Sequence, residues 1–117
     1  MIVDDSTSVR QLVSMALKSQ NYQVIEACDG MDALSKLTGS KINLIISDIN
    51  MPKMDGITFV KELKKNPSYK FTPVIMLTTE TQEGKKREAQ AAGAKAWIVK
   101  PFKPEQMLSA VAKLILP

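Results

Sequence analysis

Residues 44–56, LIISDINMPKMDG, place a short apolar run directly before Asp48 and a loop that contains proline and glycine. A continuous apolar run of this length is typical of a strand that is covered on both faces, as in a parallel sheet. Two more runs, residues 74–77 (VIML) and 97–99 (WIV), have the same character. The three runs indicate a buried parallel sheet whose strands end in polar residues.

Working outward from these runs, five strand patterns alternate with five helical patterns. Such alternation predicts a single α/β domain over residues 1–117. Right-handed crossovers place the carboxyl ends of the strands along one edge of the sheet, where ligands of open parallel sheets bind. The expected strands are residues 2–3, 23–27, 44–47, 73–78 and 96–99, and the expected helices begin near residues 6–7, 30, 55–56, 82 and 103–104.

The helical patterns differ in the apolar surface that they offer to the sheet. Ser6 or Thr7 can cap the first, Asp55 the third, and Pro104 lies in the first turn of the fifth. The second extends over residues 30–38. The fourth, residues 82–92, has alanine as its only apolar residue type and Gly84 in its first turn. Because alanine buries little area, we expect this helix to dock weakly and to be the most mobile of the five. The first has one buried stripe, made of Val9, Leu12, Val13, Ala16 and Leu17.

The composition excludes several classes of protein. No apolar run approaches the roughly 20 residues of a membrane span, and the first residues, MIVDDS, are acidic where a signal peptide is basic and then apolar. The single cysteine, Cys28, cannot form an internal disulfide, so we expect a cytoplasmic protein with no membrane partner. Histidine is absent, which excludes Ser-His-Asp and Cys-His catalysis, histidine zinc sites and phosphohistidine.

The net charge of +4 is unevenly distributed along the chain. Residues 1–60 contain five basic and seven acidic residues, whereas residues 61–117 contain eleven basic and five acidic ones. A basic half can indicate nucleic-acid binding, but a solvated, lysine-rich surface explains it as well. Aromatic residues make up only 5% of the chain and offer few platforms for base stacking. We therefore expect no direct contact with nucleic acid.

Polar side chains follow four of the five expected strands. Asp4 and Asp5 follow the first, Asp48 the third, Thr78 ends the fourth, and Lys100 follows the fifth. Each has an ordinary explanation alone, such as a helix start, a turn or a solvated lysine. Together at one edge, three carboxylates repel one another unless a cation lies among them, and oxygen ligands favour Mg²⁺. With the lysine opposite, the edge is suited to a phosphoryl group held between a metal and an ammonium.

Four segments, in order and at fitting spacings, carry a resemblance to a known family. They are residues 4–6 (DDS), 47–56 (SDINMPKMDG), 77–80 (LTTE) and 93–102 (GAKAWIVKPF). The chain resembles, over its whole length, the receiver domain of bacterial two-component response regulators, and is most similar to the stand-alone chemotaxis type. The resemblance implies a flavodoxin-like (βα)5 three-layer sandwich with a five-stranded parallel sheet in the order 2-1-3-4-5.

The resemblance also implies the chemistry of the site. Asp48 is expected to accept a phosphoryl group from the phosphohistidine of a partner histidine kinase, forming an acyl phosphate. Asp5, Asp48 and the backbone carbonyl of Asn50 are expected to bind Mg²⁺ directly, and Asp4 to act through water. Lys100 is expected to pair with Asp48 and then with the phosphoryl oxygens. The chain is then a switch rather than an enzyme, apart from its own phosphorylation and dephosphorylation.

Further residues are implied to transmit and time the signal. Thr78 is expected to bond to the phosphoryl group and Trp97 to respond, so that the face made by the fourth helix, fifth strand and fifth helix changes its binding of an output partner. Asn50 and Glu80 are expected to tune the lifetime of the phosphoryl group. The Lys100–Pro101 bond corresponds to a cis peptide position of the family.

Two alternatives remain at the level of sequence. The chain ends soon after the fifth helical pattern, which fits a receiver domain taken from a larger, for example DNA-binding, regulator. An aspartate-dependent phosphatase needs a cap domain and a second acid two residues after the nucleophile, where this chain has Asn50.

Trp97 is bulkier than the usual Tyr or Phe of the family, so simple packing is an equal explanation for it.

Overall fold

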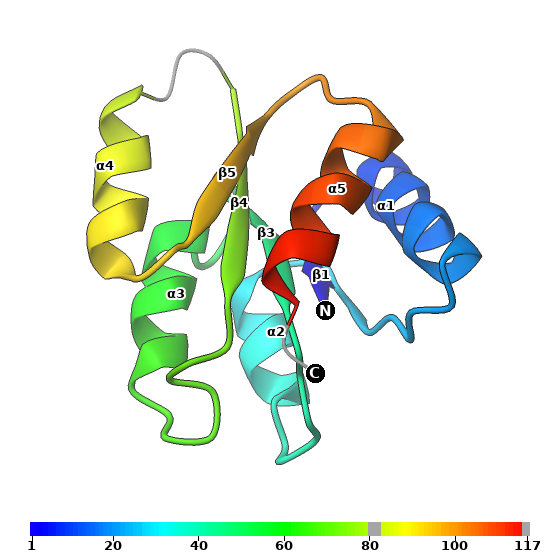
Figure 1. The fold of residues 1–117 in the computed structure, drawn as a ribbon. Helices are drawn as coiled ribbons and strands as arrows, with labels where there is room; N and C mark the ends of the chain where they lie inside the picture. Colours follow the sequence, from blue (N-terminus) through cyan, green and yellow to red (C-terminus); the bar gives the residue numbers. More distant parts are fainter. Residues whose placement is uncertain (80–82, 116–117) are drawn as a thin grey trace.

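Five strands and five helices alternate strictly over the part of the chain described by the computed structural model, residues 1–79 and 83–115 (Figure 1). No helix within these residues is long and apolar enough to span a bilayer. The strands are β1 (Ile2–Val3), β2 (Glu26–Ala27), β3 (Ile45–Asp48), β4 (Val74–Thr78) and β5 (Ala96–Val99). The helices are α1 (Thr7–Ser19), α2 (Gly30–Lys36), α3 (Gly56–Lys64), α4 (Glu83–Ala92) and α5 (Pro104–Leu114).

The strands form one parallel sheet in the order β2-β1-β3-β4-β5. This order confirms the flavodoxin-like topology that the family resemblance implied. In the register, Asp48 pairs with Leu77 and Thr78 pairs with Val99. The polar residues at the strand ends are therefore brought to one edge of the sheet, as expected for parallel strands.

Helices cover both faces of the sheet and enclose two cores (Figure 1). In β4, Val74 and Met76 belong to the core shared with α2, α3 and α4, whereas Ile75 and Leu77 belong to the core shared with α1 and α5. Successive side chains of a strand point to opposite faces, so a strand between two cores must be apolar throughout. This explains the continuous apolar run.

The starts of three helices follow the sequence prediction. Ser6 caps α1, because its hydroxyl accepts a hydrogen bond from the Val9 amide at 3.3 Å. Asp55 caps α3, because its carboxylate accepts one from the Thr58 amide at 2.7 Å. Pro104 is the first residue of α5. Ser6 and Asp55 thus satisfy backbone amides at the starts of α1 and α3, whereas Pro104 occupies a position of α5 where no amide donor is needed.

Three sequence expectations are wrong in detail. Strand β2 comprises two residues and not residues 23–27, because only Glu26 and Ala27 pair with β1. Helix α2 ends at Lys36 and not at residue 38. Leu12 does not belong to the buried stripe of α1 but is 46% exposed, because α1 contacts the sheet mainly through Val13 and Leu17.

Candidate functional site

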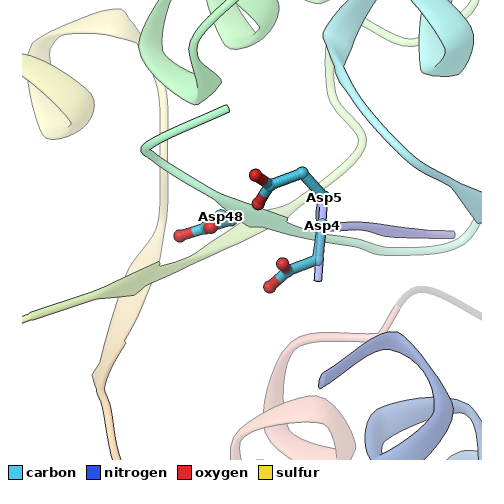
Figure 2. A group of neighbouring side chains, drawn as sticks. All are labelled: Asp4, Asp5 and Asp48. Carbon is cyan, nitrogen blue, oxygen red and sulfur yellow. The ribbon is translucent and has the colours of Figure 1, made fainter. Parts of the chain in front are cut away.

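Three carboxylates meet where β1 and β3 end. Asp4 and Asp5 follow β1 directly, and Asp48 is the last residue of β3. One oxygen from each lies within 4.8 Å of the others. Figure 2 shows the three side chains extending from these neighbouring strand ends toward a common region. Asp4 and Asp48 are buried and Asp5 is exposed, so the group opens to solvent on the Asp5 side.

Asp4 is fixed by the start of α1. Its side chain is fully buried, and one carboxylate oxygen accepts a hydrogen bond from the Ser6 amide at 2.8 Å. The Arg10 guanidinium donates to the Asp4 backbone carbonyl at 2.8 Å and lies 3.4 Å from the carboxylate of Glu26. Arg10 therefore ties the loop after β1 to both α1 and β2, a role that sequence reasoning missed because no local pattern marks it.

Lys100 provides the positive charge of the site. Its ammonium lies 3.2 Å from Asp48 Oδ1 and 3.4 Å from Asp4 Oδ2, so one cation faces two buried carboxylates. The Lys100 amide donates to the carbonyl of Thr78 at 2.6 Å, which anchors the end of β5 to the end of β4. The Lys100–Pro101 peptide bond is cis in the structure.

Asp48 lies in an environment that opposes its negative charge. Burial raises the pKa of the Asp48 carboxyl above its usual 3.8, and the neighbouring charge of Asp4 raises that pKa further. The Lys100 ammonium and a hydrogen bond of 2.9 Å from the Ile49 amide act in the opposite direction. A partly desolvated carboxylate, oriented by a backbone amide and a lysine, is a suitable nucleophile when a cation approaches it.

The loop after β3 is held close to Asp48 by a glycine. The Gly56 amide donates to the carbonyl of Ile49 at 2.7 Å. A Cβ atom at Gly56 would overlap the backbone oxygen of Asp48, which no side chain tolerates. Lys53, within the loop, has a positive φ of 67°. The glycine of the MPKMDG segment is thus required so that the start of α3 can approach the end of β3, where Asp48 lies.

Thr78 and Trp97 lie on the same face of the sheet. Thr78 ends β4 and is buried, and Trp97 pairs with Met76, two residues before it. Trp97 is half-buried against the core under α4, and the Lys86 ammonium lies 4.4 Å from the centre of its ring. Asn50 is exposed in the loop after β3. Glu80, the other residue expected to tune the phosphoryl lifetime, lies outside the described residues.

The donor set fits a hard divalent cation. Asp4, Asp5 and Asp48 offer only oxygen ligands, and their separation leaves room for one ion among them. A single lysine does not neutralise three carboxylates, so a bound cation would also relieve their mutual repulsion. Mg²⁺ takes one or two carboxylates and fills the remaining positions with water and phosphate oxygens, which suits a group that is open on one side.

Comparison with known proteins identifies the family of the chain. The family profile described as the response regulator receiver domain matches residues 1–112. The chain belongs to this family. Receiver domains are signalling modules of two-component systems rather than enzymes that turn over an external substrate, and they bind Mg²⁺ at an acidic pocket.

Individual relatives of this receiver domain are of two lengths. Protein PilG of Pseudomonas aeruginosa is 37% identical over 111 residues, which are 95% of this chain and 82% of PilG. The structure of chemotaxis protein CheY4 of Vibrio cholerae superimposes with a TM-score of 0.92 at 48% identity, covering 97% of this chain and 95% of CheY4. The transcriptional regulatory protein ResD of Bacillus subtilis is 35% identical over 115 residues, which are 98% of this chain but 47% of ResD.

Proposed function

We propose that this receiver domain is a phosphorylation-dependent switch that accepts a phosphoryl group on Asp48 from the phosphohistidine of a partner histidine kinase. The observation that carries the proposal is the position of the Asp48 carboxylate, 3.2 Å from the Lys100 ammonium and grouped with Asp4 and Asp5. We also place the switch in the cytoplasm, where Cys28, an exposed free thiol, stays reduced.

In the proposed reaction, a carboxylate oxygen of Asp48 attacks phosphorus, the bond between phosphorus and the imidazole nitrogen breaks, and an acyl phosphate forms. Asp5, Asp48 and the Asn50 carbonyl would hold Mg²⁺, with Asp4 acting through water. The bound metal supplies neutralisation of charge on the phosphoryl oxygens. Lys100, which already pairs with Asp48, turns its ammonium to the phosphoryl group and keeps that charge compensated.

The signal then passes to the face made by α4, β5 and α5. The Thr78 hydroxyl donates to the phosphoryl group, and Trp97, on the same face of the sheet, responds. Phosphorylation favours the conformer that makes these contacts, which is a shift of population. A partner protein that binds this face in one conformer reads the state of Asp48. Asn50 and Glu80, each two residues beyond a reacting position, set how readily water hydrolyses the acyl phosphate.

The relatives support a chemotaxis-type role and keep one alternative open. The chemotaxis protein CheY4 is matched over 95% of its length at 48% identity, which supports a chemotaxis-type switch that binds a partner. ResD is twice as long, which favours the second candidate, a receiver domain joined to a DNA-binding output domain. The open reading frame that encodes the chain, read with its neighbouring genes, distinguishes the two.

The decisive experiment is phosphorylation by a small donor. Incubation with acetyl phosphate and Mg²⁺ is expected to add the mass of one phosphoryl group, in an acid-labile form, and to change the fluorescence of Trp97. Asp48→Asn is expected to abolish the adduct, whereas Asp55→Asn, which retains a residue suited to capping α3, is expected to keep it. An adduct that persists in Asp48→Asn, or none in the wild type, contradicts the proposal.

A further inference from the structure

Helix α4 has little apolar surface with which to bind the sheet. Within residues 84–92, Ala89 is the one fully buried side chain, and Ala92 is partly buried. The methyl group of an alanine removes little area from water. Helix α4 packs mainly against α3, and its contacts with the strands beneath it depend on its longer side chains.

Lys86 makes such a contact with Trp97. Its ammonium lies 4.4 Å from the centre of the indole ring, within the range of a cation–π interaction. Lys86 is half-buried, whereas its neighbours Lys85 and Arg87 are exposed. Lys86 precedes Ala89 by three residues, so both lie on the side of α4 that meets the sheet. The lysine thus connects α4 to β5.

The contact lies on the face of the sheet that also carries Thr78. Trp97 and Thr78 share the face of the sheet that α4 covers, two residues apart in register across β4 and β5. We propose that Lys86 is a positioning residue that braces Trp97 and α4 in the unphosphorylated arrangement. The inference rests on the proposed phosphorylation of Asp48. A contact made in one conformer only shifts the equilibrium toward it, so removing the contact favours the phosphorylated conformer.

The test uses Trp97 as its own reporter, because it is the only tryptophan of the chain. Lys86→Met keeps an unbranched apolar stem and removes the charge, and Lys86→Gln is a second variant without charge. Lys85→Met removes an exposed charge one residue away and is the matched control. Lys86→Arg keeps a cation that can stack on the indole and tests for rescue. Each protein is titrated with beryllofluoride in Mg²⁺ while Trp97 fluorescence is recorded, and acetyl phosphate labelling of Asp48 is followed by mass.

Lys86→Met and Lys86→Gln are expected to lower the half-saturating concentration of beryllofluoride by about two- to five-fold, the range of an exposed cation–π contact. Lys85→Met and Lys86→Arg are expected to stay near the wild type. A structural role alone would change the midpoint of thermal unfolding without this shift. If Lys86→Met and Lys85→Met have the same half-saturating concentration of beryllofluoride while Asp48 is labelled normally, the inference is overturned and the proposed function stands. Absence of labelling in the wild type overturns the proposed function and the inference with it.

Discussion

At the residue scale, the ionised Asp48 side chain costs the folded protein stability when no cation is bound. Its pKa is raised by burial and by Asp4, so the folded state holds the proton more tightly than the unfolded chain, whose carboxyl keeps its usual 3.8. Asp48 therefore costs the fold no stability below pH 3.8, and this cost grows as the pH rises through the pKa of Asp48 in the folded protein. We predict that Asp48→Asn raises Tm by a few degrees at pH 7 in EDTA, measured by circular dichroism.

The pH series provides the control for this prediction. The gain of Asp48→Asn is expected to shrink as the pH is lowered toward 3.8, because the wild-type carboxyl then becomes protonated. Asp29→Asn is the matched variant: Asp29 is also buried, but it caps α2 by accepting from the Asp32 amide, which Asn does equally well. A gain that is the same at every pH contradicts the assignment of the effect to the Asp48 charge.

A second prediction at this scale concerns Lys100. Lys100→Met leaves Asp4 and Asp48 facing each other without their shared ammonium. Removing one partner of a buried ion pair is strongly destabilising, and the Lys100 side chain is 23% exposed, so we expect a loss of about 1–3 kcal/mol in urea unfolding. Added Mg²⁺ is expected to recover more stability in the variant than in the wild type. Unchanged unfolding in EDTA is the contrary result.

The sequence predicts which residues lie at the site better than it predicts the ion pairs and hydrogen bonds between them. Parallel strands end at one edge, so the positions of Asp48 and Lys100 at strand ends were enough to expect them together. The Lys100 ammonium faces both Asp4 and Asp48. This arrangement depends on side-chain conformations that are determined by the packing of β1, β3 and β5 together. The hydrogen bond from the Arg10 guanidinium to the Asp4 carbonyl also depends on the packing of several elements together. Neither is encoded in a local pattern.

At the element scale, we predict that substitution by alanine has opposite effects on stability at two glycines, Gly56 and Gly84. In Gly56→Ala, the new Cβ would overlap the Asp48 carbonyl oxygen and meet the Met76 methyl at 2.9 Å, so the start of α3 must move. We expect a loss of about 1–3 kcal/mol or more in urea unfolding. A Cβ at Gly84, in α4, would enter open space with no heavy atom outside its own helix within 4 Å, and Gly84→Ala is expected to gain roughly 0.5–1 kcal/mol. Equal effects of the two variants contradict this.

The element boundaries show where sequence patterns stop being informative. A strand extends only as far as it pairs, and β2 pairs with β1 over two residues, although the apolar pattern of residues 23–27 suggested more. Leu12 fits the helical spacing of α1, but the contact area of a helix on a sheet is narrower than its apolar stripe, so Leu12 stays exposed. Spacing reports the side of a helix, whereas packing decides how much of that side is covered.

At the scale of the whole molecule, the sheet separates two cores. Residues of β3 and β4 alternate between them, so both strands contact the helices on both faces of the sheet. The acidic group lies at the carboxyl ends of β1 and β3. The basic excess of residues 61–117 is spread over α3, α4 and the loops, and it includes Lys100 of the site itself.

Stability of the whole domain should also depend on the cation. A ligand that binds only the folded state stabilises it by about 2.7 kcal/mol at 100 times its dissociation constant, roughly 10 °C in Tm for a domain of this size. We predict such a rise on titration with Mg²⁺ and its reversal by EDTA. Asp5→Asn is the informative variant: Asp5 is exposed, so the substitution leaves the metal-free protein no less stable, yet it removes a proposed ligand and most of the Mg²⁺ gain. NaCl at equal ionic strength separates binding from screening. An equal Mg²⁺ gain in Asp5→Asn means that the cation acts elsewhere on the surface.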